Sequence, residues 1–280
     1  MISDTEVQEL VESKNLLNIG ARADEVRRRL HGTRTTFVRV FEIHIDAPVS
    51  SLPPRTSAGE FRILGSLKSL QAAVDAVRSA RVLAAEMPLT GFSLVELADL
   101  EGGSSLRDTC RVLREAGLDA IAEVPLDALE DPATTITVAR EAGLMVTRLS
   151  VSAPHDQDRG ELARRARDLQ ESIGGLRAWA PLPRTVPITS PTTGYDDVKQ
   201  IALARLIADN IESIQVDWQL YGPKLAQFAL TIGADDVDSV AAVDPGALGT
   251  RRSPLEEIRG NIKSAGLLPV ERNGRFEVIG

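Results

Sequence analysis

Cysteine is almost absent from the sequence, because Cys110 is the one thiol among 280 residues. A lone cysteine cannot form an intramolecular disulfide, and it cannot supply the several thiolates that hold an iron–sulfur cluster. Histidine is scarce as well, with three in the chain, and no spacing of His and Cys is typical of a zinc site. We therefore expect no disulfide framework, no metal ligands and no iron–sulfur cluster.

Long apolar stretches and long basic stretches are also missing from the sequence. No apolar stretch reaches the length of about 18 residues that a membrane-spanning helix needs. The N-terminal segment is acidic and lacks the apolar core of a signal peptide. The net charge is −8, and the densest basic stretch, at residues 27–34, is too short to make a phosphate-binding surface. These absences predict a cytoplasmic protein that binds neither nucleic acid nor a membrane.

Alternating strand and helix patterns fill most of the chain. Ser3 and Glu6 form a capping box at the start of a short helix, and a second helix at about 21–30 stops at Gly32. The run Thr33–Ile43 is rich in β-branched and aromatic residues and predicts the first strand. Six further strand patterns, mostly separated by helical ones, lie at 89–100, 118–124, 144–151, 176–182, 211–218 and 234–240, and the short run 61–65 could be an additional strand.

A repeated pentapeptide indicates how these elements are connected. Arg-Glu-Ala-Gly-Leu occurs at 114–118 and again at 140–144, each time as a helix end followed by entry into a strand. Such a repeat is typical of parallel strands joined by crossover helices. The glycine-rich turn of a dinucleotide-binding open sheet is missing after the first strand. We predict one TIM-barrel-like (β/α) barrel over residues 1–280, possibly incomplete with about seven strands, and an N-terminal helical extension up to about residue 32.

Five segments, in order, resemble one enzyme family. They are Phe92–Leu97 (FSLVEL), Arg167–Leu182 (RDLQESIGGLRAWAPL), Ala202–Trp218 (ALARLIADNIESIQVDW), Ala226–Val240 (AQFALTIGADDVDSV) and Ser264–Asn273 (SAGLLPVERN). The family is that of the radical S-adenosylmethionine enzymes of the futalosine route to menaquinone, aminofutalosine synthase and dehypoxanthine futalosine cyclase. The resemblance implies common descent and a barrel fold.

The loop after the first strand departs from that family. There the strand runs into His-Ile-Asn and then a Cys-x-x-x-Cys-x-x-Cys loop that holds a [4Fe–4S] cluster. Here His44–Asp46 is retained as His-Ile-Asp, but an ungapped count places Ser51, Arg55 and Ala58 at the cysteine positions. None of these can replace a thiolate on iron. We therefore expect a barrel that has lost its radical-generating centre, with the proline-rich loop 44–55 as a lid or plug over a retained cavity.

Candidate site residues lie where strands end, which is where barrels keep their chemistry. Glu96 matches the strand-end glutamate of the family and could bind a hydroxyl or an ammonium group, act as a base, or be a solvated loop acid. Asp217 and Trp218 end another strand, where the indole could stack on a purine or quinone-like ring or simply plug the barrel. Tyr221 follows them and is grouped with the substrate-binding residues.

A cluster of acids follows Gly233. Asp235, Asp236 and Asp238 could share a proton, bind a divalent ion or cap the next helix, although a metal site without His or Cys is weakly indicated. We assign Asp235 to the catalytic acids with Glu96 and Asp217, and expect all three at the C-terminal end of the barrel. Asp236, Asp238 and His44, the last a ligand contact or a rim residue, complete the substrate-binding set.

Arg205 and Asn210 belong to a family-like motif that precedes a predicted strand. Residues on that side of a barrel serve stability rather than chemistry. We therefore expect a buried network there that orients the next strand.

Three functions remain open at this point. The first is a cluster-less homologue that binds a nucleoside-like or quinone-precursor small molecule, with or without non-radical acid/base chemistry. The second is a non-catalytic partner or regulatory subunit of a true radical enzyme of the same pathway. The third is an enzyme of that pathway with a cofactor that the sequence does not reveal. We expect no cofactor, and S-adenosylmethionine binding is doubtful because its cluster ligands are replaced.

Overall fold

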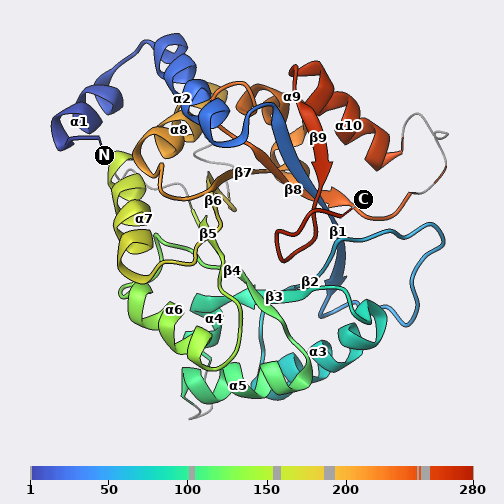
Figure 1. The fold of residues 1–280 in the computed structure, drawn as a ribbon. Helices are drawn as coiled ribbons and strands as arrows, with labels where there is room; N and C mark the ends of the chain where they lie inside the picture. Colours follow the sequence, from blue (N-terminus) through green and yellow to red (C-terminus); the bar gives the residue numbers. More distant parts are fainter. Residues whose placement is uncertain are drawn as a thin grey trace.

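The computed structural model describes residues 2–100, 105–153, 159–185, 193–244, 246 and 253–279. It contains parallel strands in the centre and helices around them (Figure 1). The strands are β1 (Arg34–His44), β2 (Glu60–Leu64), β3 (Leu89–Ser93), β4 (Ala120–Glu123), β5 (Arg148–Val151), β6 (Ala178–Pro183), β7 (Ser213–Asp217), β8 (Asp236–Ala241) and β9 (Leu268–Glu271). The helices are α1 (Asp4–Glu12), α2 (Leu16–His31), α3 (Leu70–Ala84), α4 (Leu94–Ala98), α5 (Leu106–Ala116), α6 (Pro132–Glu141), α7 (Arg159–Ile173), α8 (Gly194–Ile207), α9 (Trp218–Ala229) and α10 (Pro254–Ser264).

The first eight strands form a barrel. Their order is β4-β3-β2-β1-β8-β7-β6-β5, and every ladder between neighbours is parallel. The two edge strands meet through isolated parallel bridges, Ala120 with Met145 and Pro125 with Ser150, rather than through a full ladder. The predicted TIM-barrel-like fold is therefore confirmed, with eight barrel strands rather than about seven, in a nearly closed ring.

The ninth strand extends the short β2 along the long β1. Residues 40–44 of β1 pair with β2, whereas residues 34–37 pair with β9, so that the two strands lie one after the other beside β1. Gly59 marks the junction, because a Cβ there would lie 2.7 Å from the carbonyl oxygen of Arg272. Any larger residue would therefore push β2 away from the C-terminal segment.

The N-terminal helices pack on the outside of the barrel. The capping box of Ser3 and Glu6 is present at the start of α1. Helix α2 begins earlier than the apolar pattern suggests, because the Asn15 side chain caps it by accepting from the Asn18 amide, and it ends at Gly32 as predicted. Its buried face, which includes Ile19 and Ala23, packs in the hydrophobic core, and α2 contacts α8 (Figure 1). No helix in the described part of the chain is long and apolar enough to cross a membrane.

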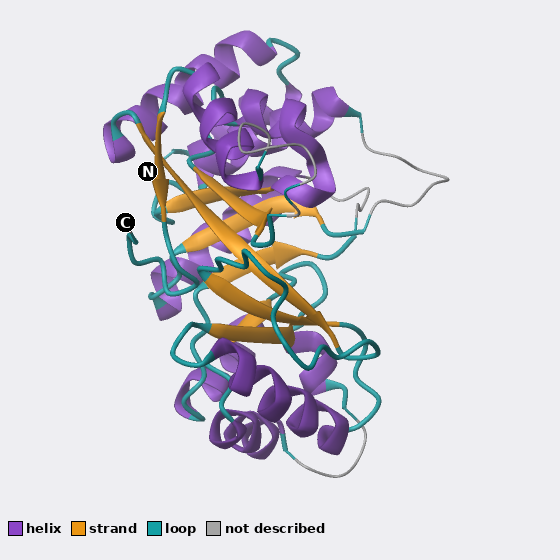
Figure 2. Cartoon of the chain, turned by 90° about the vertical axis from the view of Figure 1, so that its right-hand side faces the viewer, coloured by secondary structure: helices purple, strands orange, loops and turns teal. Residues whose placement is uncertain are grey.

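One side of the barrel is covered by a loop instead of a helix. The connection from β1 to β2 contains no helix, and Figure 2 shows strands and a loop facing the viewer on this side. A connection between parallel neighbours must return from the C-terminal end of one strand to the start of the next. The loop does so along the edge of the barrel, where the Ser57 amide donates to Ala242 and the Gly59 amide donates to Arg39, each over 2.8–2.9 Å.

Candidate functional site

The C-terminal ends of the barrel strands bring four charged side chains together. Glu42 lies near the end of β1, Glu123 ends β4, Asp217 ends β7, and Arg184 follows the last residue of β6. Because parallel strands all end on the same side, residues far apart in the sequence meet there. At this mouth of the barrel, charged groups from four strand ends line open space.

Arg184 connects the acids of the mouth. Its Nη1 donates to Asp217 over 2.7 Å, its Nε donates to Glu123 over 3.2 Å, and Nη2 lies 3.8 Å from Asp238 below. Burial disfavours the charged form of Arg184, but these three carboxylates outweigh burial and hold its pKa above the ordinary value. Burial alone would raise the pKa of Glu123. The positive charges of Arg184 and Arg148 have the larger effect, so that the pKa of Glu123 is lowered. The guanidinium is therefore a permanent cation in the centre of the mouth.

Two cavities open beside this ion-paired centre. The first, of about 340 Å³, is lined by residues from β1, β2, β4, β7 and β8: Glu42, Arg62, Leu64, Glu123, Arg184, Asp217, Gln219, Leu220 and Ser239. The second, of about 320 Å³, lies over β3, β4 and β5 and is lined by Ser93, Val95, Glu96, Glu123, Pro125, Ala128, Ser152 and Arg184. Each volume is at the lower end of the range for small-molecule sites, roughly 300–1,000 Å³.

Glu96 and Asp217 both lie at the mouth, in different cavities. Glu96 is the third residue of α4, directly after β3, and forms a capping box with Ser93. Asp217 caps α9 by accepting from the Leu220 amide over 2.9 Å, while its other oxygen accepts from Arg184 and from the Ser239 hydroxyl. Each carboxylate thus stabilises a helix start and still faces a cavity.

Asp235 lies at the opposite end of the barrel, so its expected placement with Glu96 and Asp217 is wrong. Strand β8 starts one residue after it, which puts Asp235 at the N-terminal side. Its carboxylate accepts from Arg205 and from the Ile214 amide, and His31 Nε2 lies 3.4 Å away. Burial raises the pKa of Asp235, with Arg205 opposing the rise. This buried pair joins elements below the barrel and cannot touch a ligand at the mouth.

Asp236 and Asp238 are buried inside the barrel rather than exposed to a ligand. Asp236 forms a two-pronged ion pair with Arg272, with 2.6 Å for each contact, and also accepts from Gln215. One layer higher, Asp238 accepts from Arg62 and Arg148 at 2.7–3.1 Å. Both aspartates are 0% exposed. The substrate-binding role expected for them is therefore wrong: their oxygens already have partners, and they fill the barrel.

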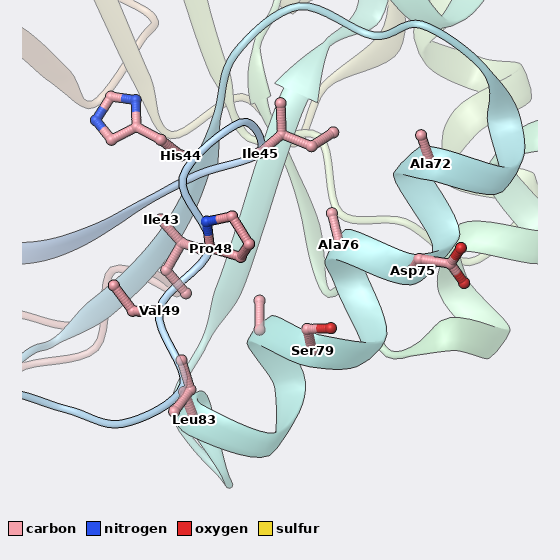
Figure 3. A pocket seen from close by; sticks show the side chains of 11 residues that line it. Ile43, His44, Ile45, Pro48, Val49, Ala72, Asp75, Ala76, Ser79 and Leu83 are labelled. Atoms are coloured by element: carbon pink, nitrogen blue, oxygen red, sulfur yellow. The ribbon is translucent and has the colours of Figure 1, made fainter.

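His44 is one of the residues that line the groove beside β1, at its edge. Figure 3 shows its ring turned away from α3, while Ile45 and Pro48 lie between the loop and the helix. The groove there has about 210 Å³ and is lined mainly by apolar side chains of the loop and α3. His44 lines neither cavity of the mouth. The ligand contact expected for it is not part of the observed site.

The loop after β1 does not cover the mouth, so the expected lid or plug is wrong. Every residue from 46 to 55 is exposed, and none lines either cavity of the mouth. Asp46 forms an exposed ion pair with Lys68, and Thr56 bridges to Val243. The crossover geometry explains this, because the loop has to lead outward to the start of β2.

Trp218 and Tyr221 support the mouth from α9. Both are partly buried and pack against the hydrophobic core, and neither lines a cavity of the mouth. The Tyr221 hydroxyl donates to the Pro183 carbonyl over 2.6 Å, and burial raises its pKa. This bond fixes the end of β6 directly before Arg184. The structure thus favours the plugging alternative for Trp218 and a supporting position for Tyr221.

The residues of the first loop do not fit a [4Fe–4S] cluster. Ser51, Arg55 and Ala58 offer no thiolate, and Cys110 is 0% exposed in α5 on the outer side of the barrel wall. Burial raises the pKa of the Cys110 thiol to about 11, so it stays protonated. Within the described ranges no group of three or more His, Cys, Asp or Glu side chains is placed to hold a metal ion.

Sequence reasoning missed Arg184, Glu123 and Glu42. The signal that identified Asp217 is the presence of a charged residue at the end of a strand. The same signal applies to Glu123 at the end of β4, to Arg184 directly after β6 and to Glu42 near the end of β1.

Glu42 gives a prediction about stability. Burial raises the pKa of Glu42, with Arg62 opposing and Asp217 adding to the rise. A carboxyl with a raised pKa in the folded state loses stability when it ionises. We expect Glu42→Gln to raise the melting temperature at pH 7–8 and to leave it unchanged below about pH 4, where Glu42 is protonated in both states. Thermal melting against pH measures this, and the exposed Glu115→Gln is the control. Equal melting curves at pH 8 would contradict it.

Comparisons with known proteins identify relatives that match 62–72% of this chain. Residues 180–279 match the family described as the CofH/MqnC C-terminal region. The chain is 29% identical over 245 residues to aminodeoxyfutalosine synthase of Streptomyces coelicolor, which covers 72% of this chain and 63% of that protein. It is 29% identical over 198 residues to cyclic dehypoxanthine futalosine synthase of the same organism, covering 62% of this chain and 50% of that protein. It is also 29% identical over 213 residues to a 5-amino-6-(D-ribitylamino)uracil–L-tyrosine 4-hydroxyphenyl transferase of Methanosarcina acetivorans, covering 63% of this chain and 55% of that protein.

Solved structures confirm the fold. HydG, a maturase of the [FeFe]-hydrogenase, superposes with a TM-score of 0.66 over 96% of this chain and 72% of that chain, at 12% identity. Methylornithine synthase PylB superposes with a TM-score of 0.61 over 96% of this chain and 94% of that chain, at 14% identity. The resemblance predicted from the sequence is confirmed: this chain, which spans about half to two thirds of its curated relatives, is a homologue of the aminodeoxyfutalosine and cyclic dehypoxanthine futalosine synthases.

Proposed function

We propose that the mouth of this barrel binds a polyhydroxylated, nitrogen-containing small molecule such as a nucleoside, and that it does so without cluster-based radical chemistry. One observation carries the proposal: the strand ends retain two cavities lined by carboxylates, hydroxyls and arginine, while the loop after β1 offers no thiolate. Carboxylates accept hydrogen bonds from sugar hydroxyls and amino groups, and two oxygens each give them several acceptor positions.

The names of the relatives agree with this ligand class. The transferase is named for 5-amino-6-(D-ribitylamino)uracil, a compound with a ribityl group and a nitrogen-containing ring, and the two synthases are named for aminodeoxyfutalosine and cyclic dehypoxanthine futalosine. A descendant of such a barrel could keep the polar pocket after losing the cluster. Glu42 is the residue that would exchange a proton with a bound ligand, because it faces the first cavity and its pKa is raised.

Isothermal titration of adenosine into the protein tests the binding proposal. We expect binding by the wild type and about tenfold weaker binding by Asp217→Asn, because a hydrogen bond to a charged group contributes roughly 1.5–3 kcal/mol. Asparagine also caps helices well, so α9 should keep its start. If neither adenosine nor other ribosylated compounds bind, the proposal is wrong.

Iron content tests the second half of the proposal. After anaerobic incubation with iron and sulfide, the protein should bind no iron and stay colourless, because no thiolates are available in the loop. The triple variant Ser51→Cys/Arg55→Cys/Ala58→Cys is the matched comparison. Stoichiometric iron on the wild type would overturn the cluster-free interpretation.

A second candidate function is that of a partner to a radical enzyme of the same pathway. The observation that favours it is apolar exposure on the loop after β1 and on α3. Val49, which lines the groove of Figure 3, and Leu52 are each 38% exposed, and Val82 on α3 is 81% exposed. Sedimentation of this protein mixed with such an enzyme tests it. A complex that the double substitution Val49→Asp/Leu52→Asp abolishes would favour this function, whereas two independently sedimenting species would exclude it.

A further inference from the structure

The two cavities of the mouth have one wall in common. Of all residues that line them, Glu123 and Arg184 are the two that both cavities share. The ion pair between Arg184 Nε and Glu123 Oε2, at 3.2 Å, therefore stands between them. Glu42 and Asp217 lie on one side of it and Glu96 lies on the other.

The wall is held in place from several directions. Arg184 contacts Asp217 as well as Glu123, and Ser239 donates to the same oxygen of Asp217 that Arg184 contacts. The segment before Arg184 is fixed by the bond from Tyr221 to Pro183. A side chain with this many ionic contacts loses them all if it swings away, so the partition is a stable feature of the barrel.

The two sides differ in chemistry. The side between β1 and β7 carries two carboxylates of its own, Glu42 and Asp217, together with the Ser239 hydroxyl and the Gln219 amide. The side over β3 and β4 has an apolar lining of Val95, Pro125 and Ala128. Its polar lining residues are Ser93, Ser152 and Glu96. The first suits a group with many hydroxyls, and the second suits a flat ring with apolar faces and a polar edge.

We propose that Arg184 is a specificity-determining residue, which together with Glu123 divides the mouth into two subsites for a two-part ligand. A polyol such as a ribosyl or ribityl group occupies the side of Glu42 and Asp217, and a heterocyclic ring occupies the side of Glu96. The bond that joins the two parts crosses over the Arg184–Glu123 pair. This inference rests on the proposed function and names the two halves of its ligand.

Fragments of one nucleoside test the division. Ribose, adenine and adenosine are titrated separately, by ligand-observed NMR for the fragments and by calorimetry for adenosine, into wild type, Glu42→Gln and Glu96→Gln. We expect Glu42→Gln to weaken ribose about tenfold and leave adenine unchanged, and Glu96→Gln to do the reverse. Both should weaken adenosine. Glutamine preserves the capping box of α4, and Glu115→Gln on the outer helix α5 is the control.

Arg184→Lys tests the wall itself. A single ammonium cannot span Glu123 and Asp217 as the guanidinium does, so the two cavities should merge. In this background each fragment should respond to both charge-removing substitutions. Circular dichroism and melting curves establish that the variant folds.

The outcomes separate the two proposals. If adenosine binds but Glu42→Gln and Glu96→Gln weaken the same fragment, or Arg184→Lys leaves the fragment pattern unchanged, the division is wrong while the proposed function stands. If neither adenosine nor its fragments bind the wild type, the proposed function fails and the division fails with it.

Discussion

Asp238→Asn is expected to lower the free energy of unfolding by about 3–5 kcal/mol, the usual cost of removing one partner from a buried ion pair. Asp238 is 0% exposed and faces Arg62 and Arg148, which are themselves buried. Asparagine has nearly the same shape, so the loss isolates the charge. Arg62 would retain the carboxylate of Glu60, whereas Arg148 would lose the carboxylate with which it forms its ion pair and keep its bonds to the Ala122 carbonyl.

The pH dependence of this difference has a defined sign. Although burial acts to raise the pKa of Asp238, Arg62 and Arg148 outweigh it and hold that pKa well below its ordinary value. A depressed pKa contributes stability that is present above the unfolded pKa, about 3.9, and lost as the pH falls through the folded pKa. Urea unfolding at pH 7 and pH 3 should therefore give a smaller difference at pH 3.

The control for Asp238 is an exposed ion pair. Glu141→Gln removes the partner of Arg107 on the surface, where both side chains are about half exposed. Its effect should stay below about 1 kcal/mol. An Asp238→Asn variant as stable as this control would mean that the buried arginines do not depend on Asp238.

Arg205→Ala is expected to cost a similar amount, about 3–5 kcal/mol, at the other end of the barrel. Arg205 is 0% exposed and donates to the Gly233 and Glu212 carbonyls as well as to Asp235. Its removal leaves a buried carboxylate without its cation. Chemical unfolding measures the loss, and Asp235→Asn added to Arg205→Ala should recover part of it by removing the unpaired charge.

Ligand binding distinguishes this network from the mouth. Adenosine affinity should be unchanged in folded Arg205→Ala, since the network lies at the N-terminal end. Arg177→Ala, which breaks an exposed ion pair with Glu212, is the matched control for stability. A large loss of affinity in Arg205→Ala with unchanged stability would contradict the structural assignment of Arg205 and Asp235.

Local signals predicted the elements well. The capping box at Ser3 and the stop at Gly32 are decided by a few neighbouring residues, and both are present. Helix α4 was missed because its five residues are too short for a periodic pattern, and its capping box is the one cue it offers. Strand β9 was missed because it is half-exposed and owes its conformation to pairing with β1.

The site was predicted less completely, because partners in a barrel are set by register. Asp235, Asp236 and Asp238 are adjacent in the sequence, yet one lies below the barrel and two point into it at different heights. Nothing local distinguishes them, since their partners come from residues 205, 272, 62 and 148. Arg205 is the exception, because its position before a strand correctly predicted a buried network. Asn210, in contrast, is exposed: its side chain donates to the Arg167 carbonyl, and its own carbonyl accepts from Gln170.

The pairing of β1 with both β8 and β9 has a consequence for synthesis of the chain. The Thr36 hydroxyl donates to Asp236, which lies 200 residues later in the sequence. Residues 34–37 of β1 pair with β9, which is later still. During synthesis on the ribosome β1 therefore remains without these neighbours while the intervening 200 residues and then β9 are made. Long sequence separation slows folding, and an unpaired apolar strand invites association with other chains. For β1 we therefore expect association with other chains to compete with folding until β8 and β9 have been made.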